Sequence, residues 1–377
     1  MTRLQDLETP AALVDTRRMQ HNIARMQRRM DELGVKFRPH VKTSKCLPVV
    51  QAQIAAGARG ITVSTLKEAE QFFAAGITDI LYAVGIVPAK LPHVLELRRR
   101  GCDLKIITDS VAAAQAIADF SRRHGEALET WIEIDVDGHR SGIPPEGALL
   151  VEVGRALHEG GARLGGVMAH AGSSYEFDEP EALRKVAEQE RLGTVRAAER
   201  LREAALPCPV VSVGSTPTAL SAQDLQGVTE VRAGVYVFFD LVMRNVGVCA
   251  EHDIALSVLT TVIGHQEDKG WAIVDAGWMA MSRDRGTARQ RIDYGYGQVC
   301  GLDGRPIAGA TLVGANQEHG IVAIAGSPPA AIAERLPAGA LVRILPNHAC
   351  ATAAQHDHYQ TVTGQSSGPE WQRFSGW

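Results

Sequence analysis

The sequence has no apolar stretch long enough to span a membrane, and its first residues, MTRLQDLETP, lack the apolar core of a signal peptide. It also has no basic stripe, because 39 Lys and Arg residues stand against 43 Asp and Glu residues and the net charge is only -4. These absences argue against a membrane, secreted or nucleic-acid-binding protein. They predict a cytoplasmic protein with neither a membrane nor a nucleic acid as its partner.

The six cysteines form no CxxC pair and no regular disulfide framework. We therefore expect reduced thiols, most of them small apolar groups in the core. The chain has no internal repeat and no low-complexity tract. Its 377 residues, 45% of them apolar and 22% charged, are enough for a full core and predict two domains.

Short apolar runs alternate with helix-like segments through the first two thirds of the chain. The helix-like segments, such as residues 66–76, 110–125 and 183–205, carry apolar residues three and four apart, and several end at glycine. The eight apolar runs are residues 35–41, 60–65, 79–85, 104–109, 130–136, 164–170, 209–215 and 230–238. Strands that alternate with helices in this way form parallel crossovers, so the pattern predicts a closed (β/α)8 barrel.

The pattern changes after about Val246, where apolar stretches are separated by glycine-rich turns and long helices are absent. Such a pattern is typical of a mostly antiparallel β-domain. We predict a barrel domain at residues 14–245 and a β-domain at residues 246–377. Residues 1–13 are expected to add an N-terminal strand to the second domain.

Polar residues cluster where the predicted barrel strands end, which is where such barrels place their active sites. Lys42, in the motif RPHVKTSK, stands among imidazole and hydroxyl groups that a strand does not need. A single lysine at a strand end is usually only solvated, so the cluster carries the inference rather than Lys42 alone. The cluster comprises His40, Lys42, Ser64, Thr65, Asp109, the GHRSG turn at 138–142, His170, Tyr175, the GSTPT run at 214–218, Arg232 and Gly234.

His348 and Cys350, in the motif PNHAC, form a candidate metal site. They follow the apolar run LVRIL at alternate positions, so in an extended segment both side chains leave the same face. Imidazole and thiolate together are typical ligands of zinc-like divalent ions. The alternative is that both side chains are merely packed at a strand end.

Taken together, these motifs resemble the alanine-racemase-type pyridoxal-phosphate enzymes, in the branch of D-serine dehydratases and D-threonine aldolases. The resemblance covers the whole chain and rests on RPHVKTSK, DGHRSG, GSTPT, RAGVY and PNHAC. It implies pyridoxal phosphate and a divalent metal ion (zinc, manganese, magnesium or cobalt) as cofactors. It also implies a homodimer, in which the β-domain of one subunit closes the barrel mouth of the other.

The resemblance assigns roles to the barrel residues. Lys42 matches the lysine that binds the cofactor covalently, with Lys45 as a rival. Arg232 matches the residue that faces the pyridine nitrogen, where a permanent positive charge disfavours protonation of the ring. The other expected cofactor contacts are Ser215, Thr216, Gly234 and Val235 at the phosphate, Arg140 at the phenolic oxygen, and Tyr175 in the pocket. His170 also lines the pocket and, with Lys42, is expected to be a catalytic residue.

The expected reaction is elimination of water from a D-3-hydroxy amino acid, with D-threo-3-hydroxyaspartate as the expected substrate. Lys42 removes the α-proton, the metal at His348 and Cys350 polarises the β-hydroxyl, and a keto acid and ammonia leave. The alternatives are D-serine as substrate, retro-aldol cleavage to glycine and an aldehyde, racemisation, or a carrier without activity. The cysteine favours elimination, because aldolases of this branch usually have an aspartate in place of Cys350.

Two further groups of residues are candidates for contacts with the substrate. A substrate with a distal carboxylate needs a cation, and the uncommitted candidates are Arg38, Arg244, Arg283 and Arg285. Glu318 and His319, in the motif NQEHG, are candidates to orient a metal-bound water or the substrate.

Overall fold

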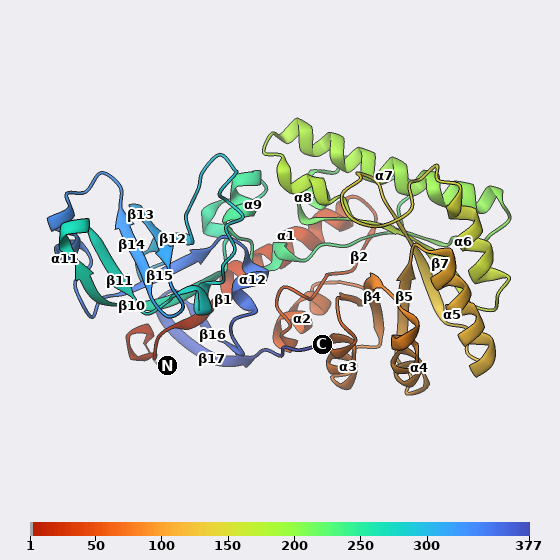
Figure 1. The fold of residues 1–377 in the computed structure, drawn as a ribbon, viewed down its shortest axis with the longest axis horizontal. Helices are drawn as coiled ribbons and strands as arrows, with labels where there is room; N and C mark the ends of the chain where they lie inside the picture. Colours follow the sequence, from red (N-terminus) through yellow and green to blue (C-terminus); the bar gives the residue numbers. More distant parts are fainter. Residues whose placement is uncertain (1–2) are drawn as a thin grey trace. The chain divides into compact units, whose positions relative to one another are not determined.

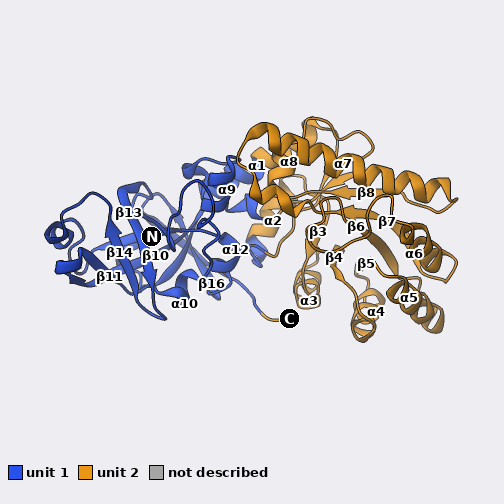
Figure 2. Ribbon diagram, turned by 45° about the horizontal axis from the view of Figure 1, so that its top comes forward, with its two compact units in different colours: residues 1–24, 43–48, 235–375 blue, residues 25–42, 49–234, 376–377 orange. Residues whose placement is uncertain are grey.

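The computed structural model describes residues 3–377, which form two compact units (Figures 1 and 2). The first contains the chain up to Ala24, Thr43–Pro48 and Val235–Ser375, and the second contains Arg25–Lys42, Val49–Gly234 and Gly376–Trp377. The predicted domain limits, residues 14–245 and 246–377, are drawn along the sequence, whereas these two units are defined by packing. The limits therefore stay a prediction. No helix among residues 3–377 has the length and apolar character needed to cross a membrane.

The second unit is built on an eight-stranded parallel sheet that closes on itself. Its strands are β2 (Lys36–Phe37), β3 (Ile61–Val63), β4 (Asp79–Gly85), β5 (Asp103–Thr108), β6 (Glu129–Ile134), β7 (Arg163–Ala169), β8 (Val210–Val213) and β9 (Glu230–Val231). The order is β2-β9-β8-β7-β6-β5-β4-β3, and a parallel bridge between His40 and Thr62 joins the two edges. The predicted (β/α)8 barrel is confirmed.

The first barrel strand is much shorter than residues 35–41, the run that predicted it. Lys36, Arg38 and His40 all donate backbone hydrogen bonds towards β9 and the residues beside it. On the other side, Pro39 has no amide hydrogen to donate towards β3. The regular strand ends at Phe37, and an isolated bridge at His40 joins the following residues to β3.

Helices follow the barrel strands and cover the outer face of the sheet (Figure 2). In chain order the helices are α1 (Thr16–Glu32), α2 (Leu47–Ala55), α3 (Leu66–Ala74), α4 (Leu91–Arg99), α5 (Val111–His124), α6 (Leu149–His158), α7 (Pro180–Glu203) and α8 (Thr216–Ser221), of which α1 and α2 each begin in the first unit and end in the second. The predicted helices at 66–76, 110–125 and 183–205 correspond to α3, α5 and α7. Thr65 caps α3 by accepting a hydrogen bond from the Glu68 amide at 3.0 Å, and α5 ends at Gly125, whose φ is 64°.

The first unit is a mostly antiparallel β-structure. Its strands are β1 (Ala11–Asp15), β10 (Leu256–Gln266), β11 (Trp271–Val274), β12 (Gly297–Cys300), β13 (Pro306–Ala315), β14 (Gly320–Ile324), β15 (Leu341–Pro346), β16 (His358–Thr363) and β17 (Ser366–Gln372). β10 pairs with both β11 and β15, which closes six strands into a barrel, while β1 pairs with β10 and β16. The short helices α9 (Leu241–Val246), α10 (Trp278–Met281), α11 (Ile332–Arg335) and α12 (Ala349–Ala353) fill its loops.

Candidate cofactor and metal sites

The carboxyl ends of the barrel strands bring the predicted cofactor residues to one end of the second unit. Lys42 follows β2, Arg140 follows β6, His170 follows β7 and Arg232 follows β9. They lie close enough to interact, since Lys42, Arg232 and Arg140 all act electrostatically on His170. The Lys42 side chain is exposed. The structure therefore confirms the clustering that the strand-end pattern predicts.

His170 is held as a neutral ring. Its Nδ1 lies 2.9 Å from the carbonyl oxygen of Gly214, an atom that can only accept, so Nδ1 carries the hydrogen. Burial and the nearby positive charge of Lys42 lower the pKa of His170 to about 3. Nε2 is then left as a hydrogen-bond acceptor at neutral pH. The Tyr175 ring, on the 3₁₀ turn Gly172–Glu176, has its centre 6.3 Å from that of His170.

A network of hydroxyl groups organises the loop after β8. Ser215 caps α8, and its Oγ lies 2.8 Å from Ser174 Oγ and 3.0 Å from Thr218 Oγ1. Thr216 is 1% exposed. Gly214 is required at the strand end, because its φ is 136° and a Cβ would lie 2.1 Å from the Arg232 carbonyl oxygen.

Glu190 of α7 ties the ends of β7 and β8 together, a role that the sequence did not reveal. Its Oε1 accepts hydrogen bonds from the amides of Ala171, at 2.9 Å, and Gly214, at 3.0 Å. Burial raises the pKa of this carboxyl group despite those bonds. The only sequence signal is indirect: Glu190 occupies a buried position on a long amphipathic helix.

The two predicted arginines differ in their surroundings. Arg232 is 4% exposed, and it donates from Nε to Ser212 Oγ at 2.8 Å and from Nη2 to the Ala169 carbonyl oxygen. Arg140 is exposed and lies 3.6 Å from Glu133, whose pKa burial raises. The turn that carries Arg140 is fixed by Asp109, which accepts from the Gly142 amide at 2.9 Å.

Unsatisfied polar atoms show that this end of the barrel fits pyridoxal phosphate. The buried His40 Nδ1 has no hydrogen-bond partner among residues 3–377. Arg232, a buried cation at the same end, has hydrogen bonds to Ser212 and Ala169 but no carboxylate in direct contact within residues 3–377. Burying such groups costs free energy unless a partner arrives. A ligand with a ring nitrogen and anionic oxygens supplies such partners.

The metal-ligand pair lies in the first unit, but not in the extended segment that the sequence suggested. β15 ends at Pro346, His348 is the N-terminal cap of α12, and Cys350 lies in the first turn of that helix. The expectation of an extended HxC segment is therefore wrong, because a helix begins at Ala349. The turn still brings the two side chains into hydrogen-bonding contact.

Three neighbours fix the geometry of this pair. The Nδ1 of His348 lies 2.9 Å from Asp284 Oδ2, so Nε2 is the nitrogen left for a metal. Burial opposes a charge on His348, but Cys350, Asp284 and Asp240 outweigh it and raise the pKa of His348. Thr43 directly follows Lys42 in the sequence, and its Oγ1 lies 3.1 Å from the Cys350 sulfur.

Further hydrogen bonds fix the backbone around the two candidate ligands. Asp240, the cap of α9, accepts from the Ala349 amide at 2.8 Å and from the Met243 amide at 2.9 Å. Asn347 is 2% exposed and donates to the carbonyl oxygens of Asp284, at 3.1 Å, and Gly295, at 2.8 Å. An aspartate before an apolar helical segment is a recognisable cap, but its second bond to Ala349 could not be read from the sequence.

This donor set fits a divalent metal with an open coordination sphere. No group of three or more His, Cys, Asp or Glu side chains within residues 3–377 is arranged to hold a metal by itself. His348 and Cys350 offer two ligands, so water or substrate oxygens must complete the coordination, as in catalytic rather than structural zinc sites. All six cysteines are free thiols, as expected.

The arginines named as candidates for a distal carboxylate divide into two groups. Arg38 is wrong for this role, since it is 6% exposed and forms ion pairs with Glu230 at 3.0 Å and Asp79 at 2.7 Å. The other three are in the first unit. Arg244 is 3.4 Å from Glu251, Arg285 is 3.0 Å from Asp293, and Arg283 lies over the Trp278 ring at 4.1 Å.

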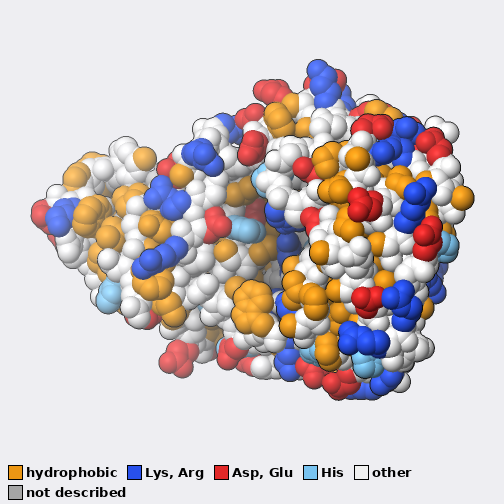
Figure 3. All heavy atoms as spheres, turned by 45° about the vertical axis from the view of Figure 1, so that its right-hand side comes forward, with side chains coloured by type: hydrophobic (Ala, Val, Ile, Leu, Met, Phe, Trp, Pro, Cys, Tyr) orange, Lys and Arg blue, Asp and Glu red, His pale blue; other side chains and the backbone are white. Residues whose placement is uncertain are grey.

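Glu318 and His319 are exposed in the turn between β13 and β14. Their proposed part in orienting water or substrate stays a prediction. Lys and Arg side chains are interspersed with Asp and Glu over the face shown in Figure 3, in keeping with the small net charge.

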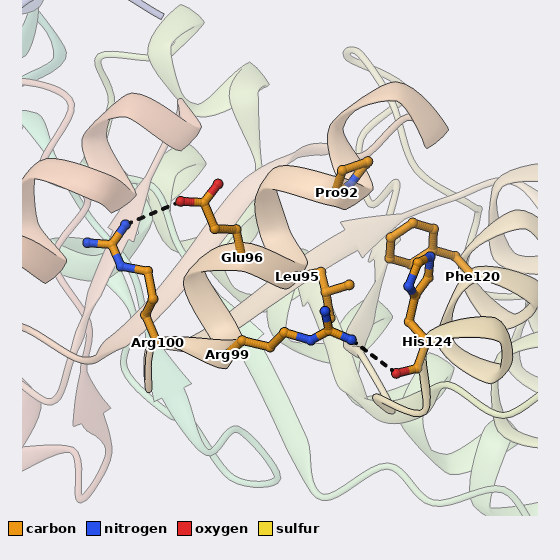
Figure 4. Close-up of a pocket in the computed structure, with 7 residues that line it drawn as sticks. All are labelled: Pro92, Leu95, Glu96, Arg99, Arg100, Phe120 and His124. Atoms are coloured by element: carbon orange, nitrogen blue, oxygen red, sulfur yellow. Dashed lines mark hydrogen bonds and ion pairs between the residues drawn. The ribbon is translucent and has the colours of Figure 1, made fainter.

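A separate hollow of about 360 Å³ lies between α4 and α5 of the barrel unit (Figure 4). Its walls include Phe120 and His124 of α5 and Arg99 at the end of α4, whose Nη2 donates to the His124 carbonyl oxygen at 3.3 Å. Arg99 and His124 are the last residues of their helices, and these helices run from the carboxyl ends of the strands towards the opposite end of the barrel. The hollow is therefore not part of the candidate cofactor site.

Comparison with known proteins places the whole chain. Residues 14–242 match the family model of the alanine racemase N-terminal domain, and residues 255–362 match that of a putative serine dehydratase domain. D-threo-3-hydroxyaspartate dehydratase of Delftia sp. (strain HT23) is 70% identical over 376 residues, covering 99% of both chains. D-threonine aldolase of Arthrobacter sp is 28% identical over 366 residues, covering 94% of this chain and 89% of the relative.

Solved structures agree with this placement. The Delftia enzyme superposes with a TM-score of 0.98 at 69% identity, covering 100% of both chains. A cysteine-to-alanine mutant of a D-threo-3-hydroxyaspartate dehydratase in its metal-free form superposes with a TM-score of 0.99 at 69% identity, again with 100% of both chains covered.

Proposed function

Because this chain belongs to the alanine-racemase-type family of pyridoxal-phosphate enzymes, we propose that it is a dehydratase of D-3-hydroxy amino acids that uses a divalent metal ion. Its substrate is D-threo-3-hydroxyaspartate, and its products are oxaloacetate and ammonia. The proposal rests above all on the 70% identity with the Delftia dehydratase along 99% of both chains. The contact between His348 and Cys350 supports it.

Bound pyridoxal phosphate withdraws electrons from Cα of the substrate, and a bound metal ion acts as a Lewis acid on the β-oxygen. Lys42 supplies the amine that anchors the cofactor, and the same amine takes the proton from Cα. The substrate thus loses the α-proton and the β-hydroxyl as water. Later hydrolysis at Cα takes up one water and releases ammonia, so that oxaloacetate and ammonia together contain all the atoms of the substrate.

The remaining barrel residues bind and orient the cofactor. Ser215 and Thr216, together with the backbone amides of Gly234 and Val235, are the proposed phosphate contacts. The buried hydroxyl network after β8 supports this assignment, because buried hydroxyls in a fixed arrangement can donate to an anionic oxygen. Arg140, in the turn held by Asp109, is the proposed partner of the phenolic oxygen.

His170 and Tyr175 line the pocket. Since the pKa of His170 is lowered to about 3, this ring does not carry a proton to be donated as an imidazolium at neutral pH. Its Nε2 instead accepts a hydrogen bond from the cofactor or substrate. The bond from Nδ1 to Gly214 fixes the direction of that acceptor.

His348 and Cys350 are the proposed metal ligands. A thiolate favours zinc-like ions over magnesium or manganese, and two protein ligands leave positions for the β-hydroxyl of the substrate. Asp284 and Asp240 position the pair rather than bind the ion.

Retro-aldol cleavage is the second candidate reaction, because D-threonine aldolase of Arthrobacter sp is a relative along 94% of this chain. The two reactions break different bonds of the same substrate. Elimination breaks the bond between Cβ and the hydroxyl oxygen, whereas cleavage breaks the bond between Cα and Cβ.

The products decide between the two reactions. The holoenzyme is incubated with D-threo-3-hydroxyaspartate, D-serine and D-threonine, each with and without a chelator. Oxaloacetate or pyruvate together with ammonia supports elimination, and loss of these products with chelator supports the metal role. Glycine and an aldehyde as the main products would refute the dehydratase assignment.

The proposal includes a cytoplasmic homodimer whose active sites combine residues from both subunits. Six free thiols suit a reducing compartment. Mixing Lys42→Ala chains with Cys350→Ala chains tests the shared site, because hybrid dimers then contain one intact set of residues. Confirmed hybrids without restored activity would show that each site is built within one chain.

A further inference from the structure

A line of charged side chains crosses the interior of the barrel, where such folds usually hold branched apolar residues. Its members, which we call the charge ladder, are Arg232, Ser212, Glu230, Arg38, Asp79, Lys105 and Asp103. Apart from the neutral Ser212, the charges alternate in sign. The ladder extends from the carboxyl ends of the strands, at Arg232, to the first residues of β4 and β5, which are Asp79 and Asp103.

Ser212 connects the first two charges. Arg232 Nε donates to Ser212 Oγ at 2.8 Å, and Ser212 Oγ donates to Glu230 Oε1 at 2.8 Å. The sheet itself dictates this arrangement, since Ser212 is paired with Glu230 in the register of β8 and β9. Arg232 follows Glu230 by two positions in an extended segment, so both side chains face the same side.

The rest of the ladder neutralises Glu230 and continues to the protein surface. Arg38 Nε lies 3.0 Å from Glu230 Oε2, and the two Nη atoms of Arg38 bind the two oxygens of Asp79 at 2.7 and 3.2 Å. Lys105 contacts Asp79 at 2.6 Å and Asp103 at 2.5 Å. Glu230 is 4% exposed and Arg38 is 6% exposed, whereas the Asp103 side chain is 55% exposed.

Arg232 depends on this ladder because it has no carboxylate in direct contact within residues 3–377. Burial lowers the pKa of Arg232, and the carboxylates of Glu230, Glu190 and Glu133 counteract this from a distance. Only Glu230 is connected to Arg232 through a hydrogen-bonding group, Ser212. The ladder therefore fixes both the charge and the direction of the guanidinium group.

We infer that Ser212 and Glu230 are positioning residues that hold Arg232, as a charged donor, against the pyridine nitrogen of the bound cofactor. The inference rests on the proposed function and on the place at the pyridine nitrogen that the family resemblance implies for Arg232. A guanidinium group held in this way keeps the nitrogen unprotonated and the ring a weak electron sink. Departure of the β-hydroxyl then depends on the metal pair.

Other groups act on the same region and must be held constant in a test. The charged and titratable side chains that face Arg232 or its neighbours are Glu230 on β9, Glu190 on α7, Glu133 on β6, Arg38 and His40 after β2, Lys42, Arg140 and His170. A substitution at Ser212 changes none of these charges. It is therefore the cleanest probe of the ladder.

The test is solid-state nitrogen NMR on holoenzyme loaded with cofactor labelled at the ring nitrogen, titrated with pH. In Ser212→Ala, Arg232 loses the acceptor of its Nε hydrogen bond and is no longer held against the cofactor. The ring nitrogen of the cofactor then becomes easier to protonate, and its titration midpoint rises. We expect kcat to fall roughly tenfold, as for loss of one hydrogen bond to a charged group, with little change in KM. Ser212→Thr keeps the hydroxyl and restores both values towards the wild type.

Thr130→Val is the matched control, since Thr130 is a fully buried residue of β6 whose hydroxyl donates to the Leu128 carbonyl oxygen at 3.3 Å and has no further partner among residues 3–377. Ser212→Cys fills the space of the serine side chain with a thiol that forms only weak hydrogen bonds. It replaces the alanine variant if that variant is unstable. If Ser212→Ala and Ser212→Cys titrate and turn over like the control, the inference is overturned.

A separate variant distinguishes the inference from the proposed function. If Arg232→Met leaves the nitrogen signal unchanged, Arg232 does not face the ring nitrogen and the inference is overturned, while oxaloacetate formation by the wild type still decides the proposed function. If the wild type forms no oxaloacetate but Ser212→Ala still raises the midpoint, the proposed reaction fails and the ladder stands.

Discussion

Asp284 should decide how tightly the His348 and Cys350 pair binds a metal ion. The Asp284 carboxylate accepts a hydrogen bond from His348 Nδ1 at 2.9 Å, and its side chain is only 28% exposed. In Asp284→Asn the charge is lost while the shape is kept. The imidazole then becomes a weaker and less well-oriented ligand through Nε2.

The size of the effect follows from the bond that is lost. A hydrogen bond to a charged group contributes about 1.5–3 kcal/mol. If most of this stabilisation is lost when His348 binds zinc in the variant, the zinc affinity falls by roughly 10–100-fold. Apart from Val235, the proposed cofactor-binding residues belong to the barrel unit, so the absorbance of bound pyridoxal phosphate should not change.

Zinc affinity is measured by competition with a chromophoric chelator, and turnover is measured at rising zinc concentration. We expect activity to recover as the ion saturates the weakened site. Asp357→Asn is the matched control, because Asp357 forms the same type of contact with His358 Nδ1, at 2.5 Å, but its side chain is 87% exposed. Equal zinc affinity in the wild type and Asp284→Asn would refute the positioning role.

Three other predictions follow from the two sites. Lys42→Ala should abolish the covalent link to the cofactor and leave the fold intact, because this side chain is exposed; borohydride reduction and peptide mapping check this, and label on Lys45 would contradict it. Cys350→Asp should shift metal preference from zinc towards magnesium or manganese, as measured by metal titration of activity. Burial holds the pKa of His170 at about 3, below its ordinary 6.5. The unfolded chain therefore binds a proton that the folded chain does not, and cofactor-free protein should lose stability as pH falls from about 6.5 towards 3, by at most about 1.4 kcal/mol per pH unit. Urea unfolding at several pH values should show that the free energy of unfolding falls less steeply with decreasing pH in His170→Gln than in the wild type.

The sequence was sufficient for the parts of the molecule that follow local periodicity. The eight apolar runs predicted the barrel, and the strand-end cluster correctly brought Lys42, His170 and Arg232 together. Both predictions succeed because alternation with helices forces parallel strands, whose carboxyl ends must lie at one end of the sheet.

Local backbone details were harder, since single residues decide them. Pro39 shortens the first barrel strand by removing one donor. At the metal pair, the apolar run LVRIL predicted an extended segment, whereas a helix begins at Ala349 and Asp240 accepts from its amide. A cap supplied from another part of the chain has no periodic signature.

The supporting carboxylates could not be predicted for the same reason. Asp284 is 64 positions from His348, Asp240 is 109 positions from Ala349, and Glu230 is 192 positions from Arg38. A lone acidic residue in a sequence is most often solvated, and only the folded chain shows which of them are buried against a partner.

Each site is supported from within its own unit. The Ser212 and Glu230 contacts that hold Arg232 all lie in the barrel unit, and the Asp284 and Asp240 contacts that hold the metal pair all lie in the β-unit. Loss of the metal therefore removes no hydrogen bond that holds Arg232. A change in either set of supports leaves the other in place. In the proposed reaction, the protonation of the cofactor and the strength of the Lewis acid can therefore be changed independently.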